Sequence, residues 1–227
     1  MSISEGRTVS VALPPHGGEG LLGFPTGPAR GVVLFAHGSG SSRFRPRNTF
    51  VAEALRQVGF ATLLFDLLTD DEAENRANVF DIGLLADRVD QAATWLREMA
   101  AWQSSPLGFF GASTAAAAAL TAAAGRDDVR AIVSRGGRPD LAGQALTKVT
   151  AATLLIVGGD DPEVLSLNKA AYRRLGCTRR LEIVPGATHL FEEPGTLQTV
   201  VALASAWLQR HLAFDVADEK NAVQRSA

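Results

Sequence analysis

The sequence predicts an α/β fold in which a mainly parallel sheet is covered by helices on both faces. Two observations favour this fold. Short apolar runs of strand length alternate with longer segments of helical character along most of the chain. The run 106–110 is apolar and aromatic throughout, as expected of a strand buried on both faces. At 227 residues, 46% of them hydrophobic, the chain is long enough for one sizeable core. We expect a single domain over 1–227, with 1–29 as an N-terminal segment and 215–227 as a frayed polar tail.

Strands and helices are expected in alternating order. Apolar runs predict strands at Gly31–Ala36, Ala61–Phe65, Pro106–Phe110, Val129–Ser134, Thr153–Val157 and Arg180–Val184. Helix formers and helical spacing predict helices at Thr49–Val58, Asp81–Trp102, Thr114–Ala124, Pro162–Leu175 and Gly195–Leu212. The acidic stretch 70–74 is expected as a loop. Only 135–148 separates two of the strands, which leaves no room for a lid domain.

Candidate catalytic residues follow three of these strands in the order serine, aspartate, histidine. Ser113 lies at a strand-to-helix turn, where Gly111 leaves room for the backbone to fold sharply. Asp161 and His189 follow later strands. A serine hydroxyl needs an imidazole to accept its proton, and the imidazole needs a carboxylate to fix its tautomer. The pattern therefore predicts a serine hydrolase with Ser113 as nucleophile, His189 as base and Asp161 as acid.

The carboxylate of this triad stays open between two neighbours. Asp160 is adjacent to Asp161 and equally ionisable. Pro162 favours Asp161, because proline biases the preceding residue toward an extended backbone. The other three histidines are weaker candidates for the base than His189. His16 lies in an N-terminal loop, His37 in the loop after the first buried strand and His211 at the end of the last helix.

The predicted oxyanion hole consists of the main-chain N–H groups of Ser39 and Thr114. Ser39 lies in a glycine-rich loop, 37–42, that directly follows a buried strand. Thr114 opens the helix after Ser113, whose positive dipole end would face the developing negative charge. Donors of this kind stabilise the tetrahedral intermediate of acyl transfer.

Three arginines are the candidate substrate-binding residues. Arg43 follows the glycine-rich loop, where it holds an anionic group of the substrate, braces the loop or is simply solvated. Arg135 and Arg138 lie at the carboxyl end of a predicted strand, where ligands of open α/β sheets bind. A solvated or salt-bridged role is the alternative for both.

These motifs together resemble the α/β-hydrolase superfamily, specifically its dienelactone-hydrolase-like branch, from about Arg30 to Leu212. The motifs are His37-Gly38-Ser39-Gly40, Gly111-Ala112-Ser113-Thr114-Ala115, Gly158-Gly159-Asp160-Asp161 with Val164, and the late His189. The resemblance implies an α/β-hydrolase fold, and its spacing favours Asp161. Dienelactone hydrolases proper use a cysteine nucleophile, whereas the elbow here carries serine and the only cysteine is the distant Cys177. Similar proteins also occur as a domain beside a phosphoribosyltransferase.

Composition limits the location and the partners. The net charge of −2 gives no basic field for a nucleic acid. One cysteine excludes an internal disulfide, the N-terminus lacks an apolar leader, and the apolar runs fall short of the roughly 20 residues of a membrane helix. We expect a cytoplasmic protein, monomer or homodimer, that binds neither nucleic acid nor membrane. No cofactor and no metal is expected, because the sequence shows no metal-ligand spacing.

The expected activity is hydrolysis of a small carboxylic ester, thioester or lactone through an acyl-enzyme intermediate. Two alternatives stay open. An acyltransferase would use the same residues, and a catalytically inactive binding module would share the fold without the chemistry.

Overall fold

The structure is a computed structural model that describes residues 6–15, 18–37 and 42–212. The expectations for Ser39, His16 and the tail 215–227 lie outside these described residues.

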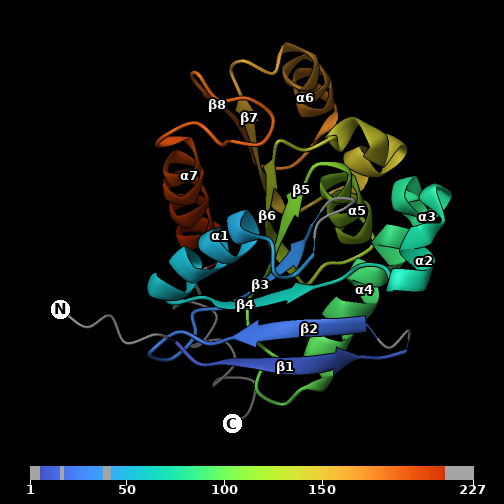
Figure 1. Cartoon of the computed structure of the whole chain (residues 1–227), viewed down its shortest axis with the longest axis vertical. Helices are drawn as coiled ribbons and strands as arrows, with labels where there is room; N and C mark the ends of the chain where they lie inside the picture. The colour runs from blue at the N-terminus through green and yellow to red at the C-terminus, as the bar shows by residue number, and fades with distance from the viewer. Residues whose placement is uncertain (1–5, 16–17, 38–41, 213–227) are drawn as a thin grey trace, which may run out of the picture.

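One eight-stranded sheet runs through the described part of the molecule, in the strand order β1-β2-β4-β3-β5-β6-β7-β8 (Figure 1). Strands β3 to β8 pair in parallel, whereas β1 pairs with β2, and β2 with β4, in antiparallel fashion. The strands are β1 (Thr8–Leu13), β2 (Gly18–Gly23), β3 (Val32–Ala36), β4 (Ala61–Phe65), β5 (Leu107–Ala112), β6 (Val129–Arg135), β7 (Ala152–Gly158) and β8 (Arg179–Val184).

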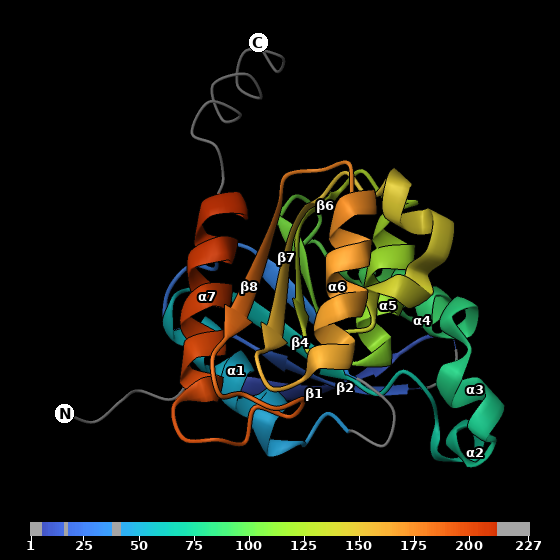
Figure 2. The ribbon, with the colours of Figure 1, turned by 90° about the horizontal axis from the view of Figure 1, so that it is seen from above.

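Helices cover both faces of the sheet (Figure 2). Helices α1 (Pro46–Gln57) and α7 (Thr196–His211) pack on one face, and α4 (Ile82–Glu98), α5 (Thr114–Ala123) and α6 (Pro162–Arg174) on the other. Two short helices, α2 (Asp70–Glu74) and α3 (Arg76–Phe80), precede α4. The α/β fold predicted from the sequence is therefore confirmed.

Two hydrophobic cores, one on each face, explain why the central strands are apolar throughout. Successive side chains of a strand point to opposite faces. Leu34 of β3 accordingly lies in the core under α4 and α5, while Val33 and Phe35 lie in the core under α1 and α7. Phe35 stacks on Phe110 of β5 with ring centroids 4.8 Å apart. Burial on both faces holds these strands in register.

Three parts of the structure differ from the expectation. Residues 70–74 form helix α2 and not a loop, because the Thr69 side chain accepts from the Glu72 N–H while the Glu72 side chain accepts from the Thr69 N–H. The N-terminal segment contains the hairpin of β1 and β2, which extends the sheet beyond β4. Helix α4 also ends at Glu98, before the expected Trp102.

The connection between β6 and β7 is short, as the sequence predicts. Two short 3₁₀ turns joined by a kink at Gly143, together η1 (Pro139–Lys148), fill it and pack against α5 and α6. The structure describes every residue between these two strands, and no lid domain lies there. No helix within the described ranges is both long enough and apolar enough to cross a membrane.

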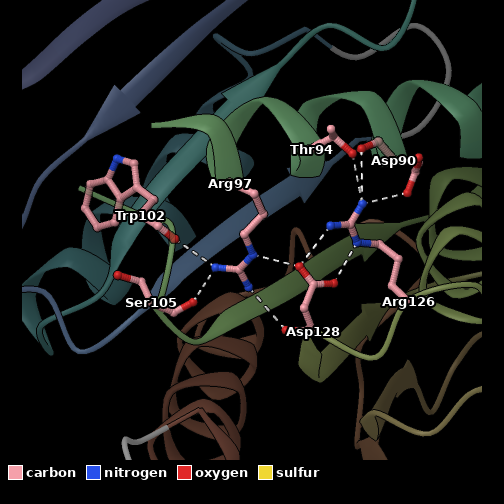
Figure 3. A network of polar contacts seen from close by, with 7 residues as sticks. All are labelled: Asp90, Thr94, Arg97, Trp102, Ser105, Arg126 and Asp128. Carbon is pink, nitrogen blue, oxygen red and sulfur yellow. Dashed lines mark hydrogen bonds and ion pairs between the residues drawn. The ribbon is translucent and has the colours of Figure 1, made fainter. Parts of the chain in front are cut away.

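A charged network fastens the amino ends of β5 and β6 to α4 (Figure 3). Arg97 of α4 donates from Nε to Asp128 Oδ2 at 2.7 Å, and Arg126 donates from Nε to Asp128 Oδ1 at 2.8 Å. Arg97 also donates to the carbonyls of Trp102 and Ser105, which lead into β5. The network therefore lies at the end of the sheet opposite to the candidate site described next.

Candidate active site

Ser113 lies at a sharp turn between β5 and α5. Its backbone has φ 53° and ψ −132°, a conformation that non-glycine residues rarely adopt and that costs about 1–3 kcal/mol. Gly111 makes the turn possible, because a Cβ on this residue would lie 2.5 Å from the Cα of Ala116 in α5. The close approach of helix and strand leaves the serine partly exposed at the carboxyl edge of the sheet.

Asp161 and His189 are in direct contact at this same edge. Asp161 caps α6, accepting at Oδ1 from the Val164 N–H at 3.4 Å, and its Oδ2 lies 2.8 Å from His189 Nδ1. A carboxylate only accepts hydrogen bonds, so Nδ1 carries the proton and Nε2 is left able to receive one. Of the two aspartates that the sequence leaves open, Asp161 contacts the imidazole, while Asp160 is exposed.

The loop after β6 links the serine to the histidine. Gly136 has φ +51°, and a Cβ there would lie 2.9 Å from the His189 carbonyl oxygen and 3.8 Å from its Cε1. Two residues later, the Arg138 N–H donates to the Ser113 carbonyl oxygen at 3.0 Å. Ser113 and His189 are both among the described residues, and no hydrogen bond joins Ser113 Oγ to His189. Catalytic hydrogen bonds are often long in the free enzyme and shorten when substrate binds.

One carboxylate that sequence reasoning missed, Asp66, holds both ends of the segment that contains Ser39. His37 Nε2 lies 3.2 Å from Asp66 Oδ1, and the Arg43 backbone N–H donates to the same oxygen at 2.9 Å. Burial raises the pKa of Asp66, but hydrogen bonds from His37 and Arg43 outweigh burial and leave the pKa below its ordinary value. Asp66 directly follows β4, so its place at the carboxyl edge was the available signal.

The predicted oxyanion donors are placed only in part. Thr114 is the first residue of α5, so its N–H has no acceptor within the helix and faces the turn at Ser113. Ser39 lies outside the described residues.

The three candidate arginines have different surroundings. Arg43 forms ion pairs with Asp66 and Glu19, which favours the bracing role. Arg138 donates two hydrogen bonds to the Asp140 carboxylate, from Nε to Oδ1 at 2.9 Å and from Nη2 to Oδ2 at 2.8 Å. The hydrogen bond to Asp140 raises the pKa of Arg138. Arg135 has no carboxylate partner among the residues that the structure describes.

A cavity of about 340 Å³ lies elsewhere, between the start of β8 and the second half of α7. Arg179, Trp207 and His211 are among its lining residues, whereas Ser113, Asp161 and His189 are not. The candidate catalytic residues therefore lie at the carboxyl ends of the strands and not in this cavity.

Curated proteins similar to this chain are found by sequence comparison. No protein-family model matches the chain. A Mycobacterium tuberculosis H37Rv protein, provisionally named a phosphoribosyl transferase, is 58% identical over 205 residues, which are 90% of this chain. The same match covers 46% of that protein, so the chain spans about half the length of the curated relatives it matches.

Solved structures match over nearly the whole chain. Carboxyl esterase 2 from Tuber melanosporum has a TM-score of 0.72 at 18% identity, covering 92% of this chain and 87% of that one, which shows the shared fold. The dienelactone hydrolase from Anabaena variabilis has a TM-score of 0.87 at 52% identity and covers 92% of this chain. Because the match includes 99% of the Anabaena chain, the protein belongs to the dienelactone hydrolase family of the α/β-hydrolase fold.

Proposed function

We propose that the protein is a serine esterase in which Ser113, His189 and Asp161 form a catalytic triad. The single observation that carries the proposal is the hydrogen bond between Asp161 Oδ2 and His189 Nδ1, at the edge where Ser113 occupies a strained turn. Strain of this kind is found at functional sites, where it exposes a nucleophile. The esterase and hydrolase names of its structural relatives are consistent with this proposal.

The reaction proceeds in two steps. Ser113 Oγ attacks the ester carbonyl carbon, and His189 Nε2 takes the hydroxyl proton while Asp161 stabilises the imidazolium. The N–H groups of Thr114 and Ser39 would stabilise the oxyanion. Collapse of the intermediate expels the alcohol, which receives the proton from His189. A water molecule, deprotonated by the same imidazole, then attacks the acyl carbon and releases the carboxylic acid and Ser113.

The substrate is a small carboxylic ester, thioester or lactone. The short η1 connection leaves the carboxyl edge of the sheet without a lid, which suits small or projecting substrates. Transfer of the acyl group to another alcohol would use the same residues. The Mycobacterium relatives named for phosphoribosyl transfer are about twice as long as this chain, so the proposal does not carry that activity over to these residues.

Intact-mass analysis after fluorophosphonate treatment tests the proposal. The wild type is expected to gain one adduct, Ser113→Ala none, and the control Ser104→Ala, an exposed serine beyond α4, the same adduct as wild type. An adduct that persists in Ser113→Ala would assign the reactive serine elsewhere. A folded wild type without adduct would favour the binding-module alternative. Ester, thioester and lactone panels, with and without added alcohol, would then separate hydrolysis from acyl transfer.

A further inference from the structure

The turn that carries His189 contains a strained residue. The Phe191 N–H donates to the Thr188 carbonyl oxygen at 3.3 Å, so His189 is a central residue of this turn. Phe191 has φ +55°, which bulky residues rarely adopt, and its side chain is 1% exposed in the core under α1 and α7. The buried ring anchors the far end of the turn. The near end, Thr188, is exposed and needs another support.

The side chain of Glu193 supplies that support. One carboxylate oxygen accepts from the Thr188 N–H at 3.1 Å, and the other accepts from the Thr188 hydroxyl at 2.5 Å. Hydrogen bonds to an ionised acceptor are shorter and stronger than neutral ones. Such bonds, first that from the Thr188 hydroxyl, hold the pKa of Glu193 below its ordinary value. The carboxylate is therefore charged at neutral pH and free to accept both bonds.

The main chain of Glu193 is itself held by the start of helix α7. Its carbonyl oxygen accepts from the Thr196 N–H at 3.1 Å and from the Thr196 hydroxyl at 2.8 Å. Thr196 is the first residue of α7, and the buried side chains of this helix pack in the core on the sheet. A continuous series of contacts therefore leads from a packed helix through Glu193 to the residue before His189.

The other contacts of His189 do not replace this support. Asp161 orients the ring through Nδ1, and Gly136 lies against the ring and the carbonyl. The side chain of His189 is nevertheless 38% exposed, so packing alone leaves the imidazole room to move. A displacement of about 1 Å between reacting groups costs on the order of 100-fold in rate. The backbone of the turn therefore has to be fixed as well.

We propose that Glu193 is a positioning residue of the candidate active site, whose carboxylate fixes the turn at Thr188 so that His189 Nε2 faces Ser113. This inference rests on the proposed esterase function and adds a residue to it. In this role Glu193 acts through geometry and not through its charge, and it does not touch the substrate. The neighbouring Glu192 offers a contrast, because its carboxylate pairs with Arg47 of α1 and not with Thr188.

Two substitutions of Glu193 separate geometry from charge. In Glu193→Gln the amide oxygen accepts from the Thr188 N–H and the amide nitrogen donates to the Thr188 hydroxyl, so both bonds survive without the charge. We expect Glu193→Ala, which removes both bonds, to lower kcat/KM for 4-nitrophenyl acetate by about 30-fold. Glu193→Gln and the matched control Glu192→Ala are expected to stay within about threefold of wild type.

Proton NMR gives a readout that does not depend on turnover. A short hydrogen bond to a carboxylate moves its proton far downfield, so the Nδ1 proton of His189 should give a separate resonance, assigned by its absence in His189→Gln. We expect this resonance to persist in Glu193→Gln and Glu192→Ala and to be lost by exchange with water in Glu193→Ala. A merely structural contact would lower the thermal unfolding midpoint and leave both the resonance and kcat/KM unchanged.

Thr188 provides a second pair of variants, which keeps the test valid if Glu193→Ala fails to fold. Thr188→Val keeps the shape of the side chain but removes the hydroxyl bond to Glu193, and it is expected to lower kcat/KM about fivefold. Thr188→Ser keeps the hydroxyl and is expected to match wild type. Equal values of kcat/KM in these two variants would contradict the role of this contact.

The outcomes distinguish this inference from the proposed function. An active wild type whose kcat/KM is unchanged by Glu193→Ala would overturn the role of Glu193 alone. So would an equal loss in Glu193→Gln, which would assign the effect to charge, or an equal loss in Glu192→Ala. If the wild type forms no Ser113 adduct and cleaves no ester, the Nδ1 resonance decides. Its loss in Glu193→Ala alone would support positioning of the histidine, and its persistence there would refute it.

Discussion

The two carboxylate oxygens of Asp161 have different partners, and this division defines its role at the residue scale. One oxygen accepts from the Val164 N–H at the start of α6, and the other faces His189 Nδ1. The helix therefore holds the carboxylate in place while the second oxygen orients the imidazole. The neighbouring Asp160 contributes only its backbone N–H, which donates to the Ala187 carbonyl oxygen at 3.0 Å.

We predict that Asp161→Asn lowers kcat/KM for a neutral ester by about 10⁴-fold, because an amide presents the wrong hydrogen-bonding group to Nδ1 and favours the wrong tautomer. Asp160→Asn, the matched control, is expected to stay within about threefold of wild type. Both are measured by nitrophenolate release, with circular dichroism to verify folding. The reverse ranking of the two variants would move the carboxylate role to Asp160.

Single residues differ in how far the sequence predicted them. Ser113, Asp161 and His189 could be found because each lies within a few residues of the end of a predicted strand, in the order serine, aspartate, histidine, and the structure has them after β5, β7 and β8. Asp66 also follows a strand, but only its place at the carboxyl edge could be predicted, because its contacts with His37 and Arg43 cross 23 residues or more and depend on the strand order. The isolation of Arg135 was equally invisible, since a missing partner is a property of the packed side chains.

At the scale of elements, the loop between β6 and η1 positions two catalytic candidates at once. Gly136 lies against His189, and Arg138 holds the Ser113 carbonyl. The parallel strands and the large helices were predictable, because burial on both faces demands apolar runs. The hairpin of β1 and β2 was not, since Gly18, Gly20 and Gly23 hide its pattern and its place depends on pairing with β4.

We predict that Gly136→Ala lowers kcat at least about 10-fold, since the new Cβ would press on the His189 carbonyl and displace the imidazole. Gly143 offers a matched control. It has φ +54°, close to the +51° of Gly136, but a Cβ there meets nothing within 4 Å. Each alanine costs about 1–2 kcal/mol of backbone strain, so only the difference in kcat reports on His189. Equal kcat values in the two variants would contradict this role of Gly136.

At the scale of the whole molecule, stability and chemistry lie at opposite ends of the sheet. The candidate triad occupies the carboxyl ends of the strands, whereas the network of Arg97, Arg126 and Asp128 lies at the amino ends (Figure 3). Changes in the network are therefore expected to alter the free energy of unfolding without altering turnover.

Asp128 makes this separation measurable through pH. Burial raises the pKa of Asp128, but hydrogen bonds from Arg126 and Arg97 outweigh burial and lower the pKa from 3.8 to about 2. A carboxyl whose pKa is lower in the folded state stabilises the fold above the unfolded pKa, and this contribution is lost as the pH falls through the folded value. The wild type should therefore lose this stabilisation between about pH 4 and pH 2.

We predict that Asp128→Asn lowers the free energy of unfolding at pH 7 by about 1 kcal/mol, a figure reduced from the full pKa shift because the side chain is partly exposed. The difference from wild type should shrink as the pH falls toward 2, where about half of the wild-type Asp128 carboxyl is neutral. Urea titrations from pH 2 to 7 at constant ionic strength measure it, with the exposed neighbour Asp127→Asn as control. Because the network lies at the other end of the sheet from Ser113, kcat at pH 7 should be unchanged in both variants. A fall in kcat confined to Asp128→Asn would show that the two ends of the sheet are coupled.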